Sequence, residues 1–299
     1  MKVFKFGGAS VKDAAAVRNV AKIISLFPKD QLIVVVSAMG KITNALERLT
    51  DAYFYKKEDP AKVLDEVKAY HVNIVRELFP DATHPFHTEL HNTLVELDWA
   101  TDGSPEYGYD QCYDQIVSLG EIISTRIVSA YLESVLPKVK WVDVRDFVKT
   151  DDTWREGKVN WELTRGLTEK KLLPAFKSHS VQVLVTQGFL GGTSENFTTT
   201  LGREGSDYTS AILAWCTDAE EVTIWKDVPG VLNADPKWFD QTVLIDKLSY
   251  QDAIELSYYG ATVIHPKTLK PLQNKNIPLR VKSFVNPEKE GTKIGRAHV

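Results

Sequence analysis

The chain has 299 residues, of which 43% are hydrophobic and 25% charged, and its formal net charge is −4. This composition is typical of a globular protein with a full core, and it excludes a disordered chain and a strongly basic nucleic-acid-binding surface. Cys112 and Cys216 are far apart, so neither a disulfide framework nor a thiolate metal site is indicated. The longest aliphatic run, Leu32 to Val36, is too short to span a bilayer. We therefore expect a cytoplasmic protein that acts on small molecules, with neither nucleic acid nor membrane as a partner.

Short strand-forming segments alternate with helical patterns along the chain. The segments rich in β-branched or aromatic residues are Val3 to Phe6, Leu32 to Val36, Val139 to Val144, Val181 to Thr186, Val222 to Trp225 and Ile277 to Val281. Ala14 to Ile24 and Ile116 to Leu132 repeat apolar residues at helical spacing, and Thr50 to Gly108 is predicted to be a helical insertion. Such alternation predicts a mainly parallel sheet with helices on both faces and ligands at the carboxyl ends of its strands.

A pair of glycines, Gly7 and Gly8, directly follows the first predicted strand and precedes Ser10 and a helix. A strand, a glycine turn and a helix N-terminus together can bind an anion, because free amides and the helix dipole converge there. Lys5, at the end of the strand, could neutralise charge on a transferring phosphoryl group. A tight turn with a solvated lysine explains the same pattern equally well.

Polar side chains also follow the second strand and interrupt the helix from Ile116 to Leu132. Ser37 and Thr43 could donate hydrogen bonds to an acidic ligand or could cap the next helix, which is the commoner role. Glu121 shares one side of its helix with two serines. Its carboxylate could pair with a substrate ammonium, or it could lie on the exposed edge of an amphipathic helix, which the pattern alone favours.

The run from Thr198 to Thr209, TTTLGREGSDYT, concentrates hydroxyls, glycines, an arginine and an aspartate between two apolar segments. Its composition suits a phosphate or carboxylate held against main chain. Two further segments, Trp225 to Pro236 and Gly260 to Thr268, could surround a base or ribose or could be ordinary surface turns. The Walker, dinucleotide-binding and protein-kinase motifs are absent from the sequence.

Three histidines, His84, His87 and His91, have spacings of three and four that could place them on one helical face as metal ligands. Pro85 interrupts the pattern, and an exposed polar surface is the preferred interpretation. We therefore predict no metal site formed by the protein alone.

Six segments occur in the order seen in aspartate kinases of the amino acid kinase superfamily, which the chain resembles: KFGGAS, VSAMGKITNAL, SLGEIIS, QGFLGGTSENFTTTLGREGSDYT, DVPGVLNADP and YYGATVIHP. The resemblance implies a three-layer α/β/α sandwich with an open, mainly parallel eight-stranded sheet. It also implies an N-terminal lobe for the amino acid and a C-terminal lobe, from about residue 200, for ATP. The implied reaction moves the γ-phosphoryl group of ATP, carried with Mg²⁺, to the β-carboxylate of L-aspartate, giving 4-phospho-L-aspartate for lysine, threonine and methionine biosynthesis.

The resemblance also assigns roles to individual residues. Lys5 resembles the phosphate-bridging lysine, and Asp207 the residue that orients it. Arg203 resembles the arginine that binds the α-carboxylate, and Glu121 the partner of the α-ammonium. The other positions that match the aspartate pocket are Ser37, Thr43, Phe189 and Ser206. The positions that match the ATP site, besides Lys5, are Gly7, Gly8, Ser10, Lys226, Asp227, Gly230, Leu232, Lys237 and Thr262.

The chain departs from the family pattern mainly around the nucleotide. The departures are Ala9 for a usual threonine, Glu204 for a glycine, Lys226 for a threonine, Lys237 for an arginine and Thr262 for a lysine. Glu204 is the least favourable of them, because a carboxylate beside ATP repels phosphate. We therefore expect its side chain to point out of the site.

Aspartate kinases continue into small ACT domains that bind lysine or threonine, whereas here IGRAHV ends the chain. We expect residues 1–293 to form the catalytic domain and Ile294 to Val299 to be a non-native tail. Feedback control and dimerisation through ACT domains are then lost, although the full-length protein is expected to be a homodimer. The alternatives are a superfamily member that phosphorylates another carboxylate or phosphate, and a catalytically silent regulatory subunit. Retention of Lys5, Arg203 and Asp207 argues against a silent subunit.

Overall fold

The computed structural model describes residues 1–235, 238–239, 241–258 and 264–296. Two residues predicted to contact ATP, Lys237 and Thr262, lie outside these ranges. Within the described part of the chain, every helix is too short or too polar to span a bilayer.

An eight-stranded sheet forms the centre of the molecule, in the order β3-β4-β2-β1-β7-β9-β10-β8. All neighbouring strands run parallel except β9 and β10, which confirms the predicted open, mainly parallel sheet. The strands are β1 (Lys2–Phe6), β2 (Leu32–Val36), β3 (Val139–Trp141), β4 (Val183–Gln187), β7 (Glu221–Lys226), β8 (Lys247–Ser249), β9 (Leu279–Ser283) and β10 (Thr292–Gly295). A separate antiparallel hairpin joins β5 (Leu190–Gly192) to β6 (Thr198–Thr200).

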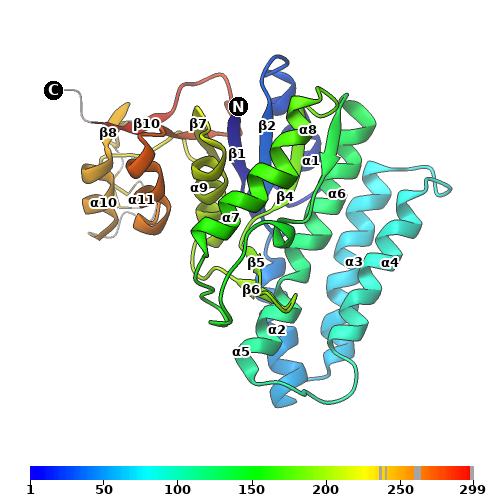
Figure 1. Ribbon diagram of the computed structural model, residues 1–299. Coiled ribbons are helices and arrows are strands. Elements are labelled where there is room, and N and C mark those ends of the chain that lie inside the picture. Colours follow the sequence, from blue (N-terminus) through cyan, green and yellow to red (C-terminus); the bar gives the residue numbers. More distant parts are fainter. Residues whose placement is uncertain (236–237, 240, 259–263, 297–299) are drawn as a thin grey trace.

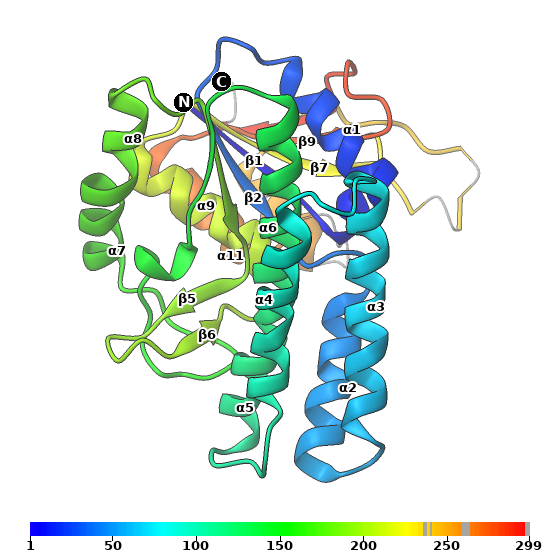
Figure 2. The same cartoon turned by 90° about the vertical axis from the view of Figure 1, so that its right-hand side faces the viewer.

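Helices cover both faces of the sheet, which is why β2 and β4 are buried along their whole length. One face carries α9 (Gly205–Thr217), against which α7 (Trp161–Leu167) and α11 (Pro266–Lys275) pack from outside (Figure 1). The other face carries α6 (Leu119–Val135) and α1 (Ala14–Ser25) (Figure 2). The remaining short helices of this part are α8 (Leu173–Lys177) and α10 (Tyr250–Tyr258).

A bundle of helices extends away from the sheet (Figure 2): α2 (Ile42–Tyr55), α3 (Pro60–Leu78), α4 (Phe86–Ala100) and α5 (Tyr109–Val117). The predicted helical insertion, Thr50 to Gly108, covers the end of α2 and all of α3 and α4, so the bundle begins earlier and ends later than predicted. His87 hydrogen-bonds through Nε2 to the backbone carbonyl of Phe79, at 3.0 Å. Among the described residues, no group of three or more His, Cys, Asp or Glu side chains could hold a metal ion.

Several predicted boundaries were wrong for identifiable reasons. The strand that starts at Val139 ends at Trp141, and the chain turns into a 3₁₀ segment, Val144–Asp146, because Gln187 Oε1 accepts a hydrogen bond from the Val144 amide at 2.8 Å. The helix predicted from Ile116 to Leu132 is two helices, α5 and α6, that meet at Ser118. The short strands β8 and β10 were missed because their sequences, KLS and TKIG, lack the β-branched run that marks the other strands.

Ile294 belongs to the fold, contrary to the expectation that the folded domain ends at residue 293. It lies in β10, pairs with Leu279 of β9 and Leu248 of β8, and is only 1% exposed. Strand β10 is an inner strand of the sheet, so its backbone is paired along both edges.

Replacing Ile294 by alanine should lower the free energy of unfolding by about 2 to 5 kcal/mol, because it leaves a cavity beneath β10. The exposed Arg296 is the matched control, and Arg296→Ala should change stability by no more than about 0.5 kcal/mol. Urea unfolding followed by circular dichroism measures both variants. Equal, small effects would mean that β10 contributes little to the fold.

Candidate active site

A cavity of about 630 Å³ opens where the carboxyl ends of β1 and β2 meet the start of α9. Ligand sites of open parallel sheets form at this edge, because the loops that follow neighbouring strands converge there. The structure brings together in this one cavity all the residues that the family resemblance placed around the amino acid, together with both predicted catalytic residues: Lys5, Ser37, Thr43, Glu121, Phe189, Arg203, Ser206 and Asp207.

The Lys5 ammonium and the Asp207 carboxylate form an ion pair, with 2.7 Å between Nζ and Oδ1. The Lys5 side chain extends from β1 into the cavity. Asp207 lies in the first turn of α9 and is 1% exposed. A second ammonium, that of Lys226 on β7, lies 3.9 Å from Asp207 Oδ2. Burial opposes ionisation of Asp207, but the charges of Lys5 and Lys226 outweigh it and hold its pKa below the usual value.

Glu121 is buried, 2% exposed, although its sequence pattern alone favoured the edge of an amphipathic helix. That interpretation was wrong because α6 is covered by the sheet and by neighbouring helices, so Ser118 and Ser124 beside it are buried too. Glu121 Oε1 accepts a hydrogen bond from the Ala38 amide at 3.2 Å, whereas Oε2 has no hydrogen-bond partner within the described part of the chain. Burial raises the pKa of Glu121 to about 8, against the opposing effects of the Ala38 amide and the Lys5 charge.

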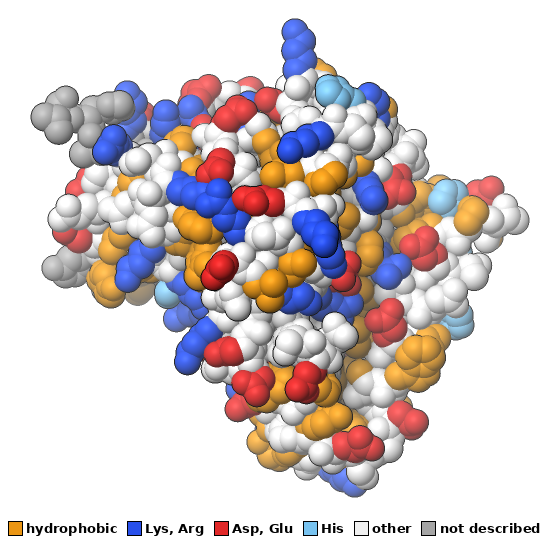
Figure 3. All heavy atoms as spheres, in the orientation of Figure 1, with side chains coloured by type: hydrophobic (Ala, Val, Ile, Leu, Met, Phe, Trp, Pro, Cys, Tyr) orange, Lys and Arg blue, Asp and Glu red, His pale blue; other side chains and the backbone are white. Residues whose placement is uncertain are grey.

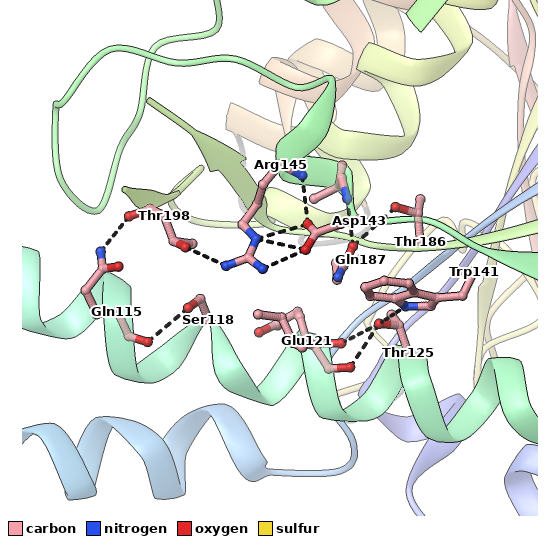
Figure 4. Close-up of polar contacts among 12 residues, drawn as sticks. Gln115, Ser118, Glu121, Thr125, Trp141, Asp143, Arg145, Thr186, Gln187 and Thr198 are labelled. Atoms are coloured by element: carbon pink, nitrogen blue, oxygen red, sulfur yellow. Dashed lines mark hydrogen bonds and ion pairs between the residues drawn. The ribbon is translucent and has the colours of Figure 1, made fainter. Parts of the chain in front are cut away.

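Hydrogen bonds fix α6 against β3 and α5 against the β5–β6 hairpin (Figure 4). The Trp141 indole donates to Thr125 Oγ1 at 3.0 Å, and this hydroxyl donates to the backbone carbonyl of Glu121 at 2.9 Å. One turn before α6, the Gln115 amide donates to the carbonyl of Thr198 at 2.8 Å. These contacts hold in place the two helices that meet at Ser118, just before Glu121.

The segment Gln187 to Phe189 packs tightly on the first turn of α9. A Cβ atom at Gly188 would lie 2.5 Å from the Cβ of Ser206, so only glycine permits this approach. The Phe189 amide donates to Thr209 Oγ1 at 2.9 Å, and Phe189 adopts a left-handed conformation with φ of 69°. The contact between this segment and α9 therefore positions both Phe189 and Ser206 in the cavity lining.

Glu204 lines the cavity, so the expectation that its side chain points out of the site was wrong. Its backbone is left-handed, with φ of 56°, a conformation that explains why glycine is the usual residue at the matching position. Although much of the residue is exposed, partial burial and the charge of Asp207 raise the pKa of Glu204, while the charge of Lys226 lowers it.

The glycine turn predicted for ATP lies beside Lys5. A Cβ atom at Gly7 would lie 3.3 Å from the Lys5 ammonium, and one at Gly8 would lie 2.7 Å from the Gly40 carbonyl oxygen. The Ser10 hydroxyl is buried and has no hydrogen-bond partner among the described residues. The turn therefore brings its backbone close to the ammonium and carries one polar group whose hydrogen-bonding capacity is unused.

The described residues that follow β7 in the predicted nucleotide segment, up to Asp235, are not part of the cavity lining. A Cβ atom at Gly230 would lie 2.5 Å from Thr292 Oγ1, and Leu232 forms a bridge with Leu244. Asp227 is exposed. The structure therefore gives Gly230 and Leu232 packing roles at the base of the loop.

Three residues that line the cavity were missed: Tyr113, Arg155 and Glu156. Tyr113 is in α5, and the other two belong to the segment 151–158, which has no helix or strand. Because that segment has no periodic pattern, its sequence carried no signal that it would meet the loop after β6.

The proton on Glu121 should make stability depend on pH. Because its pKa is raised to about 8 in the folded protein, its stabilising contribution is complete below the unfolded-state pKa and is lost as pH rises through about 8. The free energy of unfolding should fall between about pH 5 and 8 by up to about 1.4 kcal/mol per unit, and Glu121→Gln should remove that slope.

Asp114 provides the control for this measurement. Burial raises the pKa of Asp114 to about 6, so Asp114→Asn should alter the slope below about pH 6 and leave it unchanged above about pH 7. Urea unfolding at several pH values tests both variants. A slope above pH 7 that survives in Glu121→Gln would contradict the assignment.

Comparison with known proteins agrees with this geometry. Residues 1–283 match the profile of the Amino acid kinase family. Aspartokinase 1, chloroplastic, of Arabidopsis thaliana is 34% identical over 300 residues, which cover 98% of this chain and 51% of that protein. Bifunctional aspartokinase/homoserine dehydrogenase 2, chloroplastic, of the same plant is 33% identical and is covered over 32% of its length.

A crystal structure of E. coli aspartokinase III in complex with aspartate and ADP superimposes with a TM-score of 0.91 at 31% identity, covering all of this chain and 65% of that one. The chain thus spans less than two thirds of the length of these relatives. With a family match over nearly its whole length and the same fold as these enzymes, the chain belongs to the amino acid kinase family.

Proposed function

We propose that this chain is the catalytic domain of an aspartate kinase, which transfers the γ-phosphoryl group of ATP to the β-carboxylate of L-aspartate to give 4-phospho-L-aspartate. One observation carries the proposal: the cavity contains two buried charged features. They are the Glu121 carboxylate, one oxygen of which has no hydrogen-bond partner among the described residues, and the ion pair of Lys5 and Asp207. The first suits a substrate ammonium and the second a phosphoryl group. The names of the relatives, and the aspartate and ADP bound to the E. coli enzyme, support the same assignment.

The amino acid is recognised by charge at both of its polar ends. Glu121 is the partner for the α-ammonium, because its Oε2 is buried and lacks a hydrogen bond. Arg203 is available for the α-carboxylate, since it makes no hydrogen bond or ion pair with another described residue, and its guanidinium can bind a carboxylate through two nitrogens. The hydroxyls of Ser37, Thr43 and Ser206 line the space between them.

The phosphates of ATP fit beside Lys5. The Ser10 hydroxyl, which lacks a hydrogen-bond partner among the described residues, is a donor in the turn that follows Lys5, and the Gly7 backbone comes close to the Lys5 ammonium. Lys226 adds a second positive charge near Asp207. Since no cluster of three metal-ligating side chains exists among the described residues, Mg²⁺ would be held chiefly by phosphate oxygens. Bound there, Mg²⁺ would supply neutralisation of phosphate charge.

Catalysis then needs little covalent chemistry from the protein. The β-carboxylate of aspartate is already ionised near neutral pH, so no general base is required. Asp207 keeps the Lys5 ammonium protonated and oriented at 2.7 Å, and Lys5 stabilises the charge on the transferring group. The intact pair argues against a catalytically silent subunit.

The proposal also covers partners and location. On the face drawn in Figure 3, acidic and basic side chains are interspersed, which suits small charged substrates better than a nucleic acid. Both cysteines are free and buried, as expected in a reducing compartment such as the cytoplasm.

The decisive experiment combines ATP, Mg²⁺, a panel of amino acids and hydroxylamine, which traps an acyl phosphate as a hydroxamate. Aspartate alone should give both ADP and hydroxamate. Lys5→Ala should lower kcat by about 10² to 10³ with little change in the KM for aspartate, whereas the exposed Lys22→Ala should leave kcat unchanged. Hydroxamate from N-acetylglutamate, or ADP release with UMP, would overturn the proposal.

Glu204 should weaken ATP binding, because its carboxylate lies in the cavity next to Asp207. Glu204→Gln should therefore lower the KM for ATP by about tenfold, the equivalent of about 1.4 kcal/mol of repulsion removed. Glu156→Gln, a neutralised carboxylate in the lining of the same cavity, is the matched control and should leave this KM unchanged. Steady-state kinetics at saturating aspartate would refute the prediction if both variants behaved alike.

A further inference from the structure

A second arginine, Arg155, lines the cavity from a segment to which neither the sequence motifs nor the proposed mechanism gives a role. Its backbone is anchored by Asp114 of α5, which is fully buried. Asp114 Oδ2 accepts hydrogen bonds from the amides of Arg155 at 2.9 Å and Thr200 at 3.0 Å, and Oδ1 accepts one from the Thr200 hydroxyl at 2.7 Å. One carboxylate thus ties the loop, a helix and the strand β6 together.

The guanidinium of Arg155 is also held in place. It lies over the ring of Tyr113, 4.2 Å from the centroid, and its Nη1 is 3.3 Å from Asp110 Oδ1. An arginine has five N–H donors in a planar fork, and the Asp110 contact uses Nη1 alone. Arg155 is therefore oriented and still has donors for a ligand.

The loop that carries Arg155 touches the loop that carries Arg203. Gly202 has a left-handed φ of 74°, and a Cβ atom there would lie 3.2 Å from the Arg155 carbonyl oxygen and 3.1 Å from Glu156 Cγ. The Gly157 amide also donates to the Thr200 carbonyl at 2.9 Å. Two arginines thus reach one cavity from adjacent loops.

Arg155 and the cations of the phosphoryl end have different partners. Asp207, which marks that end, is paired with Lys5 and Lys226, whereas Arg155 is paired with Asp110 and stacked on Tyr113 of α5. A carboxylate between Arg155 and Arg203 would therefore be the one that does not react. Such a carboxylate is the α-carboxylate of the substrate.

We propose that Arg155 is a specificity-determining residue that binds the α-carboxylate of the amino acid substrate together with Arg203. When two guanidiniums bind one carboxylate, the affinity for the ligand depends strongly on the charge of that carboxylate. A neutral group in its place leaves both arginines without a compensating negative charge. The inference rests on the proposed function, because it takes L-aspartate as the substrate.

Calorimetric binding of three ligands in the absence of ATP tests the assignment: L-aspartate, L-asparagine, which keeps the α-carboxylate, and L-isoasparagine, in which the α-carboxylate is an amide. Arg155→Gln should weaken aspartate and asparagine by about 10- to 100-fold and isoasparagine by less than about twofold. Arg155→Lys should recover only part of the loss, because lysine lacks the planar fork. In turnover assays, the KM for aspartate should rise while kcat changes little.

Arg48→Gln is the matched control, since Arg48 is an exposed arginine with two glutamate partners, Glu58 and Glu66, outside the cavity. It should leave all three affinities unchanged. Equal weakening of all three ligands by Arg155→Gln, weakening confined to isoasparagine, or no change would each overturn the inference. Because calorimetry needs no turnover, absence of hydroxamate from the parent protein would count against the proposed function alone.

Discussion

The buried ion pair between Lys5 and Asp207 is the interaction on which the arrangement of the cavity depends. It joins the central strand β1 to the first turn of α9 at 2.7 Å, so the strand end and the helix start cannot separate without leaving a charge unpaired. The loop from Leu201 to Glu204 is confined between β6 and that helix. Its two left-handed residues, Gly202 and Glu204, make the sharp change of direction that the ion pair requires.

The formal charges of the residues that line the cavity nearly balance. Its charged lining residues are Lys5, Glu121, Arg155, Glu156, Arg203, Glu204 and Asp207. The raised pKa values of Glu121 and Glu204 reduce the negative charge of the site, since both groups hold a proton more readily than usual. An ammonium at Glu121 favours its ionised form, and an anion at Lys5 favours the neutral form of Glu204. Binding of the proposed zwitterionic substrate and of a polyphosphate would thereby be coupled to proton movement.

Two buried polar atoms without a hydrogen-bond partner among the described residues belong to the cavity or to the turn after Lys5. They are Glu121 Oε2, in the cavity lining, and Ser10 Oγ, in the turn. In the proposed function, the first faces the amino acid and the second the phosphates. Asp114 shows the opposite arrangement, because its three accepted hydrogen bonds hold the Arg155 loop in place.

The sequence by itself determined the parallel α/β sheet and the strand–glycine–helix turn after Lys5. Its family motifs also predicted that one site contains Lys5, Glu121, Arg203 and Asp207. These follow from local periodicity and from motifs in order along the chain, and the structure brings the four residues into one cavity. Only the tertiary structure decided the burial of Glu121, the inward position of Glu204, the place of Arg155 and the inclusion of Ile294 in the sheet. Each depends on a contact with a segment distant in sequence, such as that between Asp114 and Arg155. Local patterns carry no information about such pairings, because they arise only when the chain has folded.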